Sequence, residues 1–408
     1  MPRIYNNQME IIYRKEYVDR AMRWLDNGMI VIFTGQRRVG KSYTLKQLEA
    51  ELLNMGANVV MVDKENTDYM SIRTYENMVD YAAARTHKTK HNCLLVDEVQ
   101  EIVEYERAVR SLLSKGWRIA LTGSNAHILS SEISTLLGGR YIEIHVCSLS
   151  FNEFIQFHSL QANETSMNKY IMYGGMPHLY RIGLDNTDLV KEYLQNINNT
   201  IILKDVISRE RIRNVLFLQN LMKFVADNIG KLISATSVSK YMKQENVNIT
   251  SNVVISYLSF LCNAYILNEV PRFDIHGKRL LETNEKYYFE DIGLRNAVCR
   301  PGGQDIEKRI ENIIYLHLKR CGYTVYVGQL YTTEIDFVAK KDIETIYVQA
   351  TYIIANEETR EREFGNLKRI ADNNSKYVVS VTPMADYGKD SDGIIHIHLL
   401  DFLTRNQF

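Results

Sequence analysis

A segment of eight residues carries glycines, a lysine and a serine at the spacing of a phosphate-binding loop. Gly35, Gly40, Lys41 and Ser42 fit the pattern G-x-x-x-x-G-K-[ST], directly after an apolar run and directly before an amphipathic one. In such a loop, backbone N–H groups wrap a phosphate, the lysine reaches the β- and γ-phosphates, and the serine hydroxyl binds Mg²⁺. The sequence therefore predicts a P-loop for ATP and Mg²⁺. The predicted nucleotide-binding residues are Gly35, Gln36, Arg37, Arg38, Val39, Gly40, Lys41, Ser42 and Tyr43.

Two acids, Asp97 and Glu98, end a second apolar run. At the end of a strand beside the P-loop, Asp97 would bind Mg²⁺ and Glu98 would activate the water that attacks the γ-phosphate. The alternative is a solvated strand end, because an apolar run that ends in two acids is common by itself. We predict that Ser42 and Asp97 are metal ligands and that Glu98 is the base of ATP hydrolysis.

Further polar residues follow the next apolar runs. Ser124 and Asn125 come soon after residues 119–122, at the edge where open α/β sheets bind ligands, so one of them is predicted to orient the attacking water. The alternative is that they cap the helix that begins near Ala126. Arg140 closes a glycine-rich turn and is a candidate for the cation that neutralises charge in the transition state, with a surface arginine as the alternative. The predicted catalytic residues are Glu98, Lys41, Ser124, Asn125 and Arg140.

A sheet must position these residues, and the first 150 residues alternate apolar runs with amphipathic stretches. That alternation is typical of a doubly wound parallel sheet with helices on both faces. The predicted strands are residues 29–34, 58–63, 93–97, 118–122 and 141–146. Apolar positions at helical spacing mark covering helices at Tyr17, Ala21, Met22 and Leu25 and at Leu45, Leu48, Leu52 and Leu53. We therefore predict an α/β P-loop NTPase domain over residues 1–150.

The rest of the chain changes pattern twice. Residues 151–213 are helical apart from a turn at the Gly-Gly-Met-Pro of residues 174–177, and we predict a helical linker or lid there. Residues 214–295 contain three helical stretches and then an apolar-polar hairpin, which is the outline of a winged helix. Residues 300–408 run helix, strand, hairpin, helix and two strands, which predicts a separate α/β domain.

The composition excludes several classes of protein. The 408 residues hold 49 basic and 49 acidic side chains, so no net charge draws the chain to nucleic acid or to an anionic membrane. The 5 cysteines are widely spaced, which argues against a disulfide framework or a thiolate zinc site and favours a reducing compartment. No apolar run has the features of a secretion signal or the length of a membrane span, so we expect a cytoplasmic protein without membrane contact.

In type and order, these motifs resemble those of the bacterial and archaeal AAA-type ATPases related to the STAND and origin-recognition clades. The resemblance spans nearly the whole chain and rests mainly on GQRRVGKS at residues 35–42, LLVDEVQ at 94–100, LTGSN at 121–125 and GGR at 138–140. It implies a winged helix after the ATPase domain and a restriction-endonuclease-like domain at the C-terminus. It also implies that Arg14 lies near the nucleotide base, where a surface arginine is the alternative.

A restriction-endonuclease-like domain raises the question of a second active site. Glu311 on a helix, Asp336 on a hairpin strand, and Gln349 and Thr351 on the next strand fall where such folds place Glu, Asp and Glu-x-Lys. Metal-dependent cleavage of a phosphodiester needs clustered carboxylates and a cation beside the attacking water. Gln349 and Thr351 replace the second carboxylate and the lysine. We expect a degenerate nuclease site, and an active nuclease that depends on Glu311 and Asp336 is the alternative.

The sequence gives evidence on both sides about DNA. The predicted recognition helix, residues 251–262, contains no Lys or Arg, although phosphate contacts usually dominate the affinity for DNA. The hairpin after it carries Arg272, Lys278, Arg279 and Lys286. These residues leave two interpretations open, a contact with DNA through the wing and a solvated basic edge.

Together these features predict an ATP-driven switch. Its nucleotide state would change how the winged helix and the C-terminal domain contact DNA or a protein partner. Two alternatives stay open, namely an ATP-dependent DNA-cleaving nuclease and a nucleotide-sensing scaffold without turnover. A homo-oligomer is one expected assembly, in which Arg140 serves its own subunit or a neighbour's.

Overall fold

The computed structural model describes residues 4–6, 9–129, 137–244, 247–299, 302, 305–383 and 387–408. The chain forms two compact units. The first consists of Met1–Cys147 with Asn263–Tyr265, and the second of Ser148–Cys262 with Ile266–Phe408. Among the described residues, no helix is both long and apolar enough to cross a membrane.

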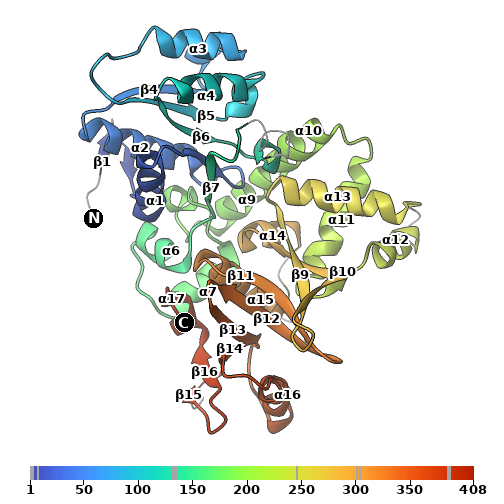
Figure 1. The fold of residues 1–408 in the computed structure, drawn as a ribbon. Helices are drawn as coiled ribbons and strands as arrows, with labels where there is room; N and C mark the ends of the chain where they lie inside the picture. Colours follow the sequence, from blue (N-terminus) through green and yellow to red (C-terminus); the bar gives the residue numbers. More distant parts are fainter. Residues whose placement is uncertain are drawn as a thin grey trace. The chain divides into compact units, whose positions relative to one another are not determined.

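A five-stranded sheet forms the centre of the first unit (Figure 1). Its strands, in spatial order, are β4 (Asn58–Asp63), β5 (Asn92–Asp97), β6 (Arg118–Thr122), β3 (Ile30–Thr34) and β7 (Tyr141–His145). All neighbouring strands run parallel, so their carboxyl ends share one edge of the sheet. The five predicted strands are confirmed, each to within one residue at either end.

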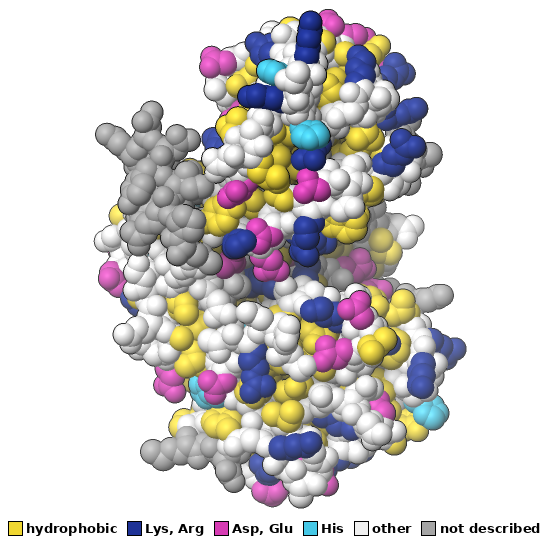
Figure 2. Space-filling view, turned by 60° about the vertical axis from the view of Figure 1, so that its left-hand side comes forward, with side chains coloured by type: hydrophobic (Ala, Val, Ile, Leu, Met, Phe, Trp, Pro, Cys, Tyr) yellow, Lys and Arg dark blue, Asp and Glu magenta, His cyan; other side chains and the backbone are white. Residues whose placement is uncertain are grey.

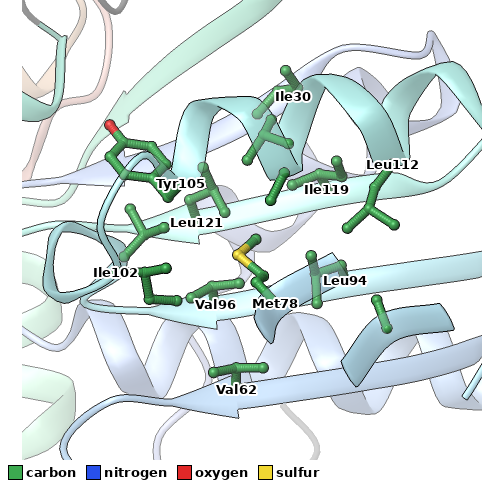
Figure 3. Packing of buried hydrophobic residues seen from close by; sticks show 14 of the residues in the cluster. Ile30, Val62, Met78, Leu94, Val96, Ile102, Tyr105, Leu112, Ile119 and Leu121 are labelled. Carbon is green, nitrogen blue, oxygen red and sulfur yellow. The ribbon is translucent and has the colours of Figure 1, made fainter. Parts of the chain in front are cut away.

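Helices cover both faces of this sheet (Figure 1). The covering helices are α1 (Lys15–Asp26) and α2 (Lys41–Asn54) on one face and α3 (Tyr75–Ala83) and α4 (Tyr105–Ser114) on the other. Successive strand residues point to opposite faces, so Leu94 and Val96 join the α3 and α4 core in Figure 3 while Leu95 joins the other core. Because both faces of the sheet are buried, the inner strands β5, β6 and β3 are mostly continuous apolar runs.

The predicted apolar stripe of α2 is right at three positions and wrong at one. Leu45, Leu48 and Leu52 are buried on the sheet, at the spacing of one helix face. Leu53 is 52% exposed because it follows Leu52 by one residue, a turn of about 100° around the helix. Short elements complete the unit, namely β1 (Ile4–Asn6), β2 (Met9–Ile11), η1 (Thr67–Tyr69), η2 (Val99–Glu101) and η3 (Ala126–Leu129).

The second unit begins with helices. They are α6 (Phe151–Phe157), α7 (Glu164–Tyr173), α8 (Leu179–Ile182), α9 (Thr187–Ile201), the π-helix η4 (Ile202–Ile207) and α10 (Ser208–Glu210). The predicted turn after α7 is confirmed: Gly174 ends α7 with φ of +71°, and a Cβ there would lie 2.3 Å from Asp291 Oδ1. The same carboxylate accepts a hydrogen bond from the Gly175 N–H at 2.7 Å through Oδ2.

Three further helices and a hairpin follow, as the sequence predicts. They are α11 (Val215–Asp227), α12 (Ala235–Gln244), α13 (Ser251–Asn263), β9 (Leu267–Asp274) and β10 (Arg279–Phe289). A short strand between the first two helices, β8 (Leu232–Ile233), pairs antiparallel with β10. The hairpin strand β10 therefore lies between β8 and β9.

The C-terminal part contains further helices and strands, and its strands join the same sheet as β8, β9 and β10. They are α14 (Ile292–Val298), α15 (Ile306–Arg320), β11 (Thr324–Leu330), β12 (Thr333–Lys341), β13 (Glu344–Ala350), α16 (Glu357–Lys368), β14 (Ser375–Ser380), β15 (Gly388–Lys389), β16 (Ile395–His398) and α17 (Leu399–Thr404). β11 pairs parallel with β9, so one nine-stranded sheet runs through the hairpin and the C-terminal strands in the order β15-β16-β14-β13-β12-β11-β9-β10-β8.

Candidate nucleotide-binding site

The predicted phosphate loop leaves β3 at Gly35, where the backbone conformation demands glycine. Gly35 has φ of +133°, which side chains rarely adopt. A Cβ at this position would lie 2.2 Å from the carbonyl oxygen of Val146. No Cβ fits at that distance, so only glycine lets the chain pass from the strand into the loop.

Lys41 points back into the loop that precedes it. It begins α2 after Gly40, which caps the helix at φ of +103°. Lys41 is 4% exposed, and its Nζ donates to the carbonyl oxygens of Gly35 at 2.9 Å and Gln36 at 3.0 Å. The ammonium group therefore lies inside the segment that the sequence assigns to phosphate.

Arg14 braces the same loop from the start of α1. Its guanidinium donates to the carbonyl oxygens of Val39 and Cys147, both at 3.1 Å, and lies 4.5 Å from the centre of the Tyr17 ring. Its backbone N–H donates to Gln47 Oε1 at 3.0 Å. Arg14 is 7% exposed, so the alternative of a surface arginine is wrong. These contacts connect the start of α1 to the loop and to Cys147.

The carboxyl edge of the sheet brings the first acid beside the loop. Asp97, the last residue of β5, accepts hydrogen bonds from the hydroxyl groups of Ser42 and Thr122. Burial raises the pKa of the Asp97 carboxyl above its ordinary value, although the two hydroxyl groups act in the opposite direction. Ser42 and Asp97, the two predicted metal ligands, thus lie within hydrogen-bond reach of each other.

Glu98 is held by several groups in a left-handed backbone conformation, with φ of 52°. Its N–H donates to Thr122 Oγ1 at 2.8 Å, and its Oε2 accepts from Ser124 Oγ at 3.0 Å and from the Gln100 amide. Burial by itself would raise the pKa of the Glu98 carboxyl, but the charge of Lys41 and the hydrogen bonds from Gln100 and Ser124 bring it below its ordinary value. An ionised proton acceptor therefore lies beside the P-loop at neutral pH.

The other predicted loop residues line the segment in different ways. Arg37 Nη1 lies 3.3 Å from Glu65 Oε1, and Tyr43 is exposed on α2. Gln36 is buried, and its Oε1 has no hydrogen-bond partner among the described residues. Asn125 is buried next to Ser124 in the loop that follows β6.

Comparison with known proteins places this site in a family. Residues 27–155 match a family model described as an AAA domain, and residues 164–305 match a domain of unknown function. An uncharacterised protein of Haemophilus influenzae is 32% identical over 404 residues, 97% of this chain and 99% of the relative. The chain belongs to the same family as that protein. Its N-terminal part is an AAA-type P-loop ATPase domain.

More distant proteins share parts of this architecture. An uncharacterised protein of Methanocaldococcus jannaschii is 26% identical and covers 88% of this chain, and 82% of its own length is matched. The solved structure of a Walker-type ATPase of Pyrococcus abyssi matches with a TM-score of 0.50 at 15% identity, covering 71% of this chain and 96% of that one. At that identity the likeness concerns the fold, which agrees with the parallel sheet of the AAA domain.

Arg140 is the one predicted catalytic residue of the AAA domain that lies away from the others. It directly precedes β7, and its carbonyl oxygen accepts from Ile30 N–H at 2.9 Å, at the amino end of β3. The P-loop leaves the opposite end of β3, about 16 Å away for five strand residues. Arg140 is exposed, and its side chain is too short to reach the P-loop of its own subunit. Of the two alternatives for Arg140, this position favours service to a neighbouring subunit, and its catalytic role stays a prediction.

Two residues beside the acids of the AAA domain are missing from the sequence prediction. Thr122 bonds to both Asp97 and the Glu98 N–H, and Gln100 bonds to the Glu98 carboxylate. A buried threonine at the end of the strand next to the acidic one is a usable signal for the first. Nothing in the local pattern indicates the second, because the turn at Glu98 brings Gln100 back to the carboxylate.

In the second unit, the residues of the predicted nuclease-like site lie close together. Asp336 N–H donates to Gln349 Oε1 at 3.3 Å, and Asp336 Oδ2 accepts from Ala350 N–H at 2.8 Å. Burial and the nearby Glu311 carboxylate raise the pKa of Asp336 well above its ordinary value. Thr351 is buried, and its hydroxyl has no partner among the described residues.

Two of the four basic residues predicted for DNA contact have internal partners. Lys286 is 1% exposed, so its predicted role on the wing surface is wrong. Arg272 is half-buried and donates to Gln329. Lys278 and Arg279 are exposed in and after the turn between β9 and β10. On the face in Figure 2, basic and acidic side chains are interspersed over most of the surface, in line with the net charge of zero.

Proposed function

We propose that this protein binds ATP with Mg²⁺ at the P-loop of its AAA domain and hydrolyses it. One observation carries the proposal: Lys41, the hydrogen-bonded pair of Ser42 and Asp97, and the Glu98 carboxylate converge at one edge of a parallel sheet. Ligands of open α/β sheets bind at that edge. The three groups are a cation for phosphate, two oxygen ligands for a metal and a base for water.

The residues present fit a magnesium ion. Ser42 and Asp97 would hold it, because hard oxygen atoms from a hydroxyl and a carboxylate are the ligands that Mg²⁺ prefers. The ion would neutralise charge on the β- and γ-phosphates. On ATP binding, Lys41 would exchange the carbonyl oxygens of Gly35 and Gln36 for phosphate oxygens, which bind an ammonium group more strongly because they are charged.

Glu98 would accept the proton of the attacking water. The depressed pKa keeps its carboxyl ionised at neutral pH, and Ser124 lies close enough to orient either the carboxylate or the water. Gln100 and Ser124 both donate to Oε2, and Oε1 is the second carboxylate oxygen that would accept a hydrogen bond from the attacking water. Asn125, buried beside Ser124, is the other candidate for orienting that water.

Arg140 would act on the site of a neighbouring copy. An exposed arginine at the amino end of β7 suits a contact between subunits, and such an arginine can stabilise the charge of the transition state when supplied in trans. The proposal therefore includes a homo-oligomer as the hydrolytic form.

For the second unit we propose two folds. Three helices, with β8 after the first and the β9–β10 hairpin after the last, support a winged helix within residues 214–295. The order α15, β11, β12, β13, α16, β14 supports a restriction-endonuclease-like domain within residues 300–408. Residues 1–150 would then be the ATPase domain and 151–213 the helical linker or lid.

The protein would work as a switch, in which the nucleotide state changes the contacts of the second unit with a partner. DNA is the partner that Lys278 and Arg279 favour, because both are exposed at the tip of the proposed wing. Two such residues form a small basic strip, so the contact would be weak and sensitive to salt.

The test is steady-state release of phosphate from ATP, with and without Mg²⁺ and with and without duplex DNA. Glu98→Gln should lower the rate about 100-fold or more, since general base catalysis contributes that much. The proposal of hydrolysis is contradicted if the wild-type protein binds ATP but its phosphate release equals that of Glu98→Gln. That result would favour a nucleotide-sensing scaffold.

A further inference from the structure

The second unit contains a lysine buried among carboxylates. Lys286, on β10, is 1% exposed. Its Nζ lies 2.9 Å from Glu311 Oε1, 2.7 Å from Glu334 Oε1 and 4.0 Å from Asp336 Oδ1. Glu311 comes from α15, and the other two acids come from β12. We call these four residues the Lys286 cluster.

The cluster keeps the lysine charged. Burial alone would lower the pKa of the Lys286 ammonium, but the three carboxylates together raise it above its ordinary value. The Tyr288 hydroxyl donates to Glu311 Oε1 at 2.6 Å. The Lys286 ammonium thus has carboxylate partners on two elements, α15 and β12. The Tyr288 hydroxyl holds the Glu311 carboxylate in place.

The backbone around Glu311 leaves room for this arrangement. Gly230 lies against the Glu311 carboxylate, and a Cβ there would be 2.4 Å from Glu311 Oε2. Gly230 has φ of +74°, so both the space and the backbone conformation favour glycine. The carboxylate is therefore held between a glycine backbone, the tyrosine and the lysine.

The resemblance to restriction endonucleases implies a divalent ion at this place, and the residues present do not fit one. Mg²⁺ needs oxygen ligands at about 2.0–2.1 Å and binds clustered carboxylates. Here the ammonium group is already bonded to Glu311 and lies beside Asp336. Gln349 carries no charge, and its Oε1 accepts from the Asp336 N–H. A divalent cation would have to displace Lys286 or bind next to its positive charge.

Lys286 is also badly placed to act as the lysine of a nuclease. It is fully buried and donates to two carboxylates, so it has no exposed N–H for a phosphate. Glu334, which is 42% exposed in its side chain, lies at the outer side of the cluster and would repel a nucleic acid backbone.

We propose that the Lys286 ammonium takes the place of the metal ion in this domain. The Lys286 cluster is an internal ion network that fastens the hairpin strand β10 to α15 and β12, and the domain does not cleave phosphodiesters. This accounts for two departures from the nuclease pattern. Without a metal ion, a second carboxylate ligand at Gln349 is not needed. Without a metal-activated water, a lysine at Thr351 is not needed either.

The experiment measures Mn²⁺ binding by paramagnetic resonance and thermal unfolding on the full chain without nucleotide. It compares the wild type with Asp336→Asn, Lys286→Met and Lys278→Met. Methionine has nearly the same length as lysine but no charge, and Lys278→Met removes an exposed lysine from the turn of the same hairpin. We expect wild type and Asp336→Asn to bind Mn²⁺ equally, because the wild-type cluster holds none.

Lys286→Met should lower Tm by roughly 5 °C or more, since it leaves three acids without their cation. It should also gain Mn²⁺ binding that the added substitution Asp336→Asn removes. Lys278→Met should change neither property. If Lys286→Met does not fold, the comparison of wild type with Asp336→Asn still decides.

The proposal is overturned by Mn²⁺ binding in the wild type that Asp336→Asn abolishes, or by Mn²⁺-dependent cleavage of plasmid DNA that the same substitution abolishes. A Lys286→Met variant as stable as Lys278→Met would overturn it equally.

Discussion

At the scale of single residues, the phosphate loop requires glycine at position 35. Its φ is +133°, and a Cβ there would lie 2.2 Å from Val146 O, so Gly35→Ala must displace the backbone of the loop or of its neighbour. We expect this variant to lose ATP binding and to unfold at a lower temperature. Isothermal calorimetry with Mg-ATP and a thermal melt measure both.

Gly28→Ala is the matched control for that substitution. Gly28 also has a positive φ, +73°, but a Cβ there would have no neighbour within 4 Å. It should cost only the strain of the left-handed conformation, about 1–2 kcal/mol, and leave ATP binding unchanged. Equal ATP binding by Gly35→Ala and Gly28→Ala would contradict the assigned role of the loop.

Asp97 should show a conflict between function and stability. Its pKa is raised in the folded protein by burial, so keeping it ionised costs folding free energy above the ordinary pKa of an aspartate. Asp97→Asn should therefore raise the Tm of the nucleotide-free protein at pH 7 and abolish the Mg²⁺ dependence of ATP binding. The gain in Tm should disappear as the pH falls below the ordinary pKa of an aspartate, where Asp97 is protonated in both states.

Thermal melts of wild type and Asp97→Asn from acidic to neutral pH measure this difference. Asp80→Asn is a suitable control, because Asp80 is an exposed aspartate of α3. A wild type that is more stable than Asp97→Asn at pH 7 would argue against a destabilising buried carboxylate.

At the scale of elements, Arg14 links the start of α1 to the P-loop by hydrogen bonds. Arg14 donates to the Val39 and Cys147 carbonyl oxygens, and a hydrogen bond from a charged group contributes about 1.5–3 kcal/mol. Arg14→Ala should lower both stability and ATP affinity, the latter about 10-fold or more for a loss of this size. Calorimetric titration with ATP measures the affinity.

Arg14→Lys separates the effect of the two hydrogen bonds from the effect of the positive charge. Lysine keeps the positive charge but lacks the planar fork that reaches two carbonyl oxygens at once. We expect it to recover only part of the loss. Full recovery by lysine would mean that the charge near the nucleotide, and not the double contact with the loop, is what matters.

The elements were predictable because their patterns are local. The inner strands of the AAA domain are mostly apolar runs, and the helices repeat apolar residues at helical spacing, so both could be located from the sequence. The P-loop and Asp97 were predictable for the same reason, since each follows directly from the end of a strand. Leu53 was wrongly assigned to the buried face of α2, because it is apolar but lies one position beyond the last buried residue, Leu52.

The remaining features depend on contacts between distant residues. Lys286 looks like a surface lysine of a hairpin, and only the packing of α15 and β12 against β10 buries it. Arg14 reaches Cys147, 133 residues away, and Gln100 reaches Glu98 through a left-handed turn. Arg140 was correctly expected just before a strand, but the sequence does not show that this is the end of the sheet away from the P-loop.

At the scale of the whole molecule, the role proposed for Arg140 would make hydrolysis depend on assembly. If it serves a neighbouring copy, the rate of phosphate release per subunit should rise with protein concentration, and Arg140→Ala should lower it about 1,000-fold or more. Mixing Arg140→Ala with Lys41→Ala should restore part of the activity, because each copy supplies what the other lacks.

Arg23→Ala, which removes an exposed arginine of α1, is the control for that experiment and should leave the rate unchanged. A rate per subunit that is independent of concentration, together with an active Arg140→Ala variant, would contradict the role in trans.

The central claim is that residues 35–42 bind the triphosphate, and its most direct test is calorimetric titration of the full chain with ATP at saturating Mg²⁺. We expect one ATP per chain for the wild type, the same stoichiometry for Glu98→Gln, and no measurable heat for Lys41→Ala. A folded wild type that takes up no ATP, or a Lys41→Ala variant that binds it as tightly as the wild type, would contradict the account.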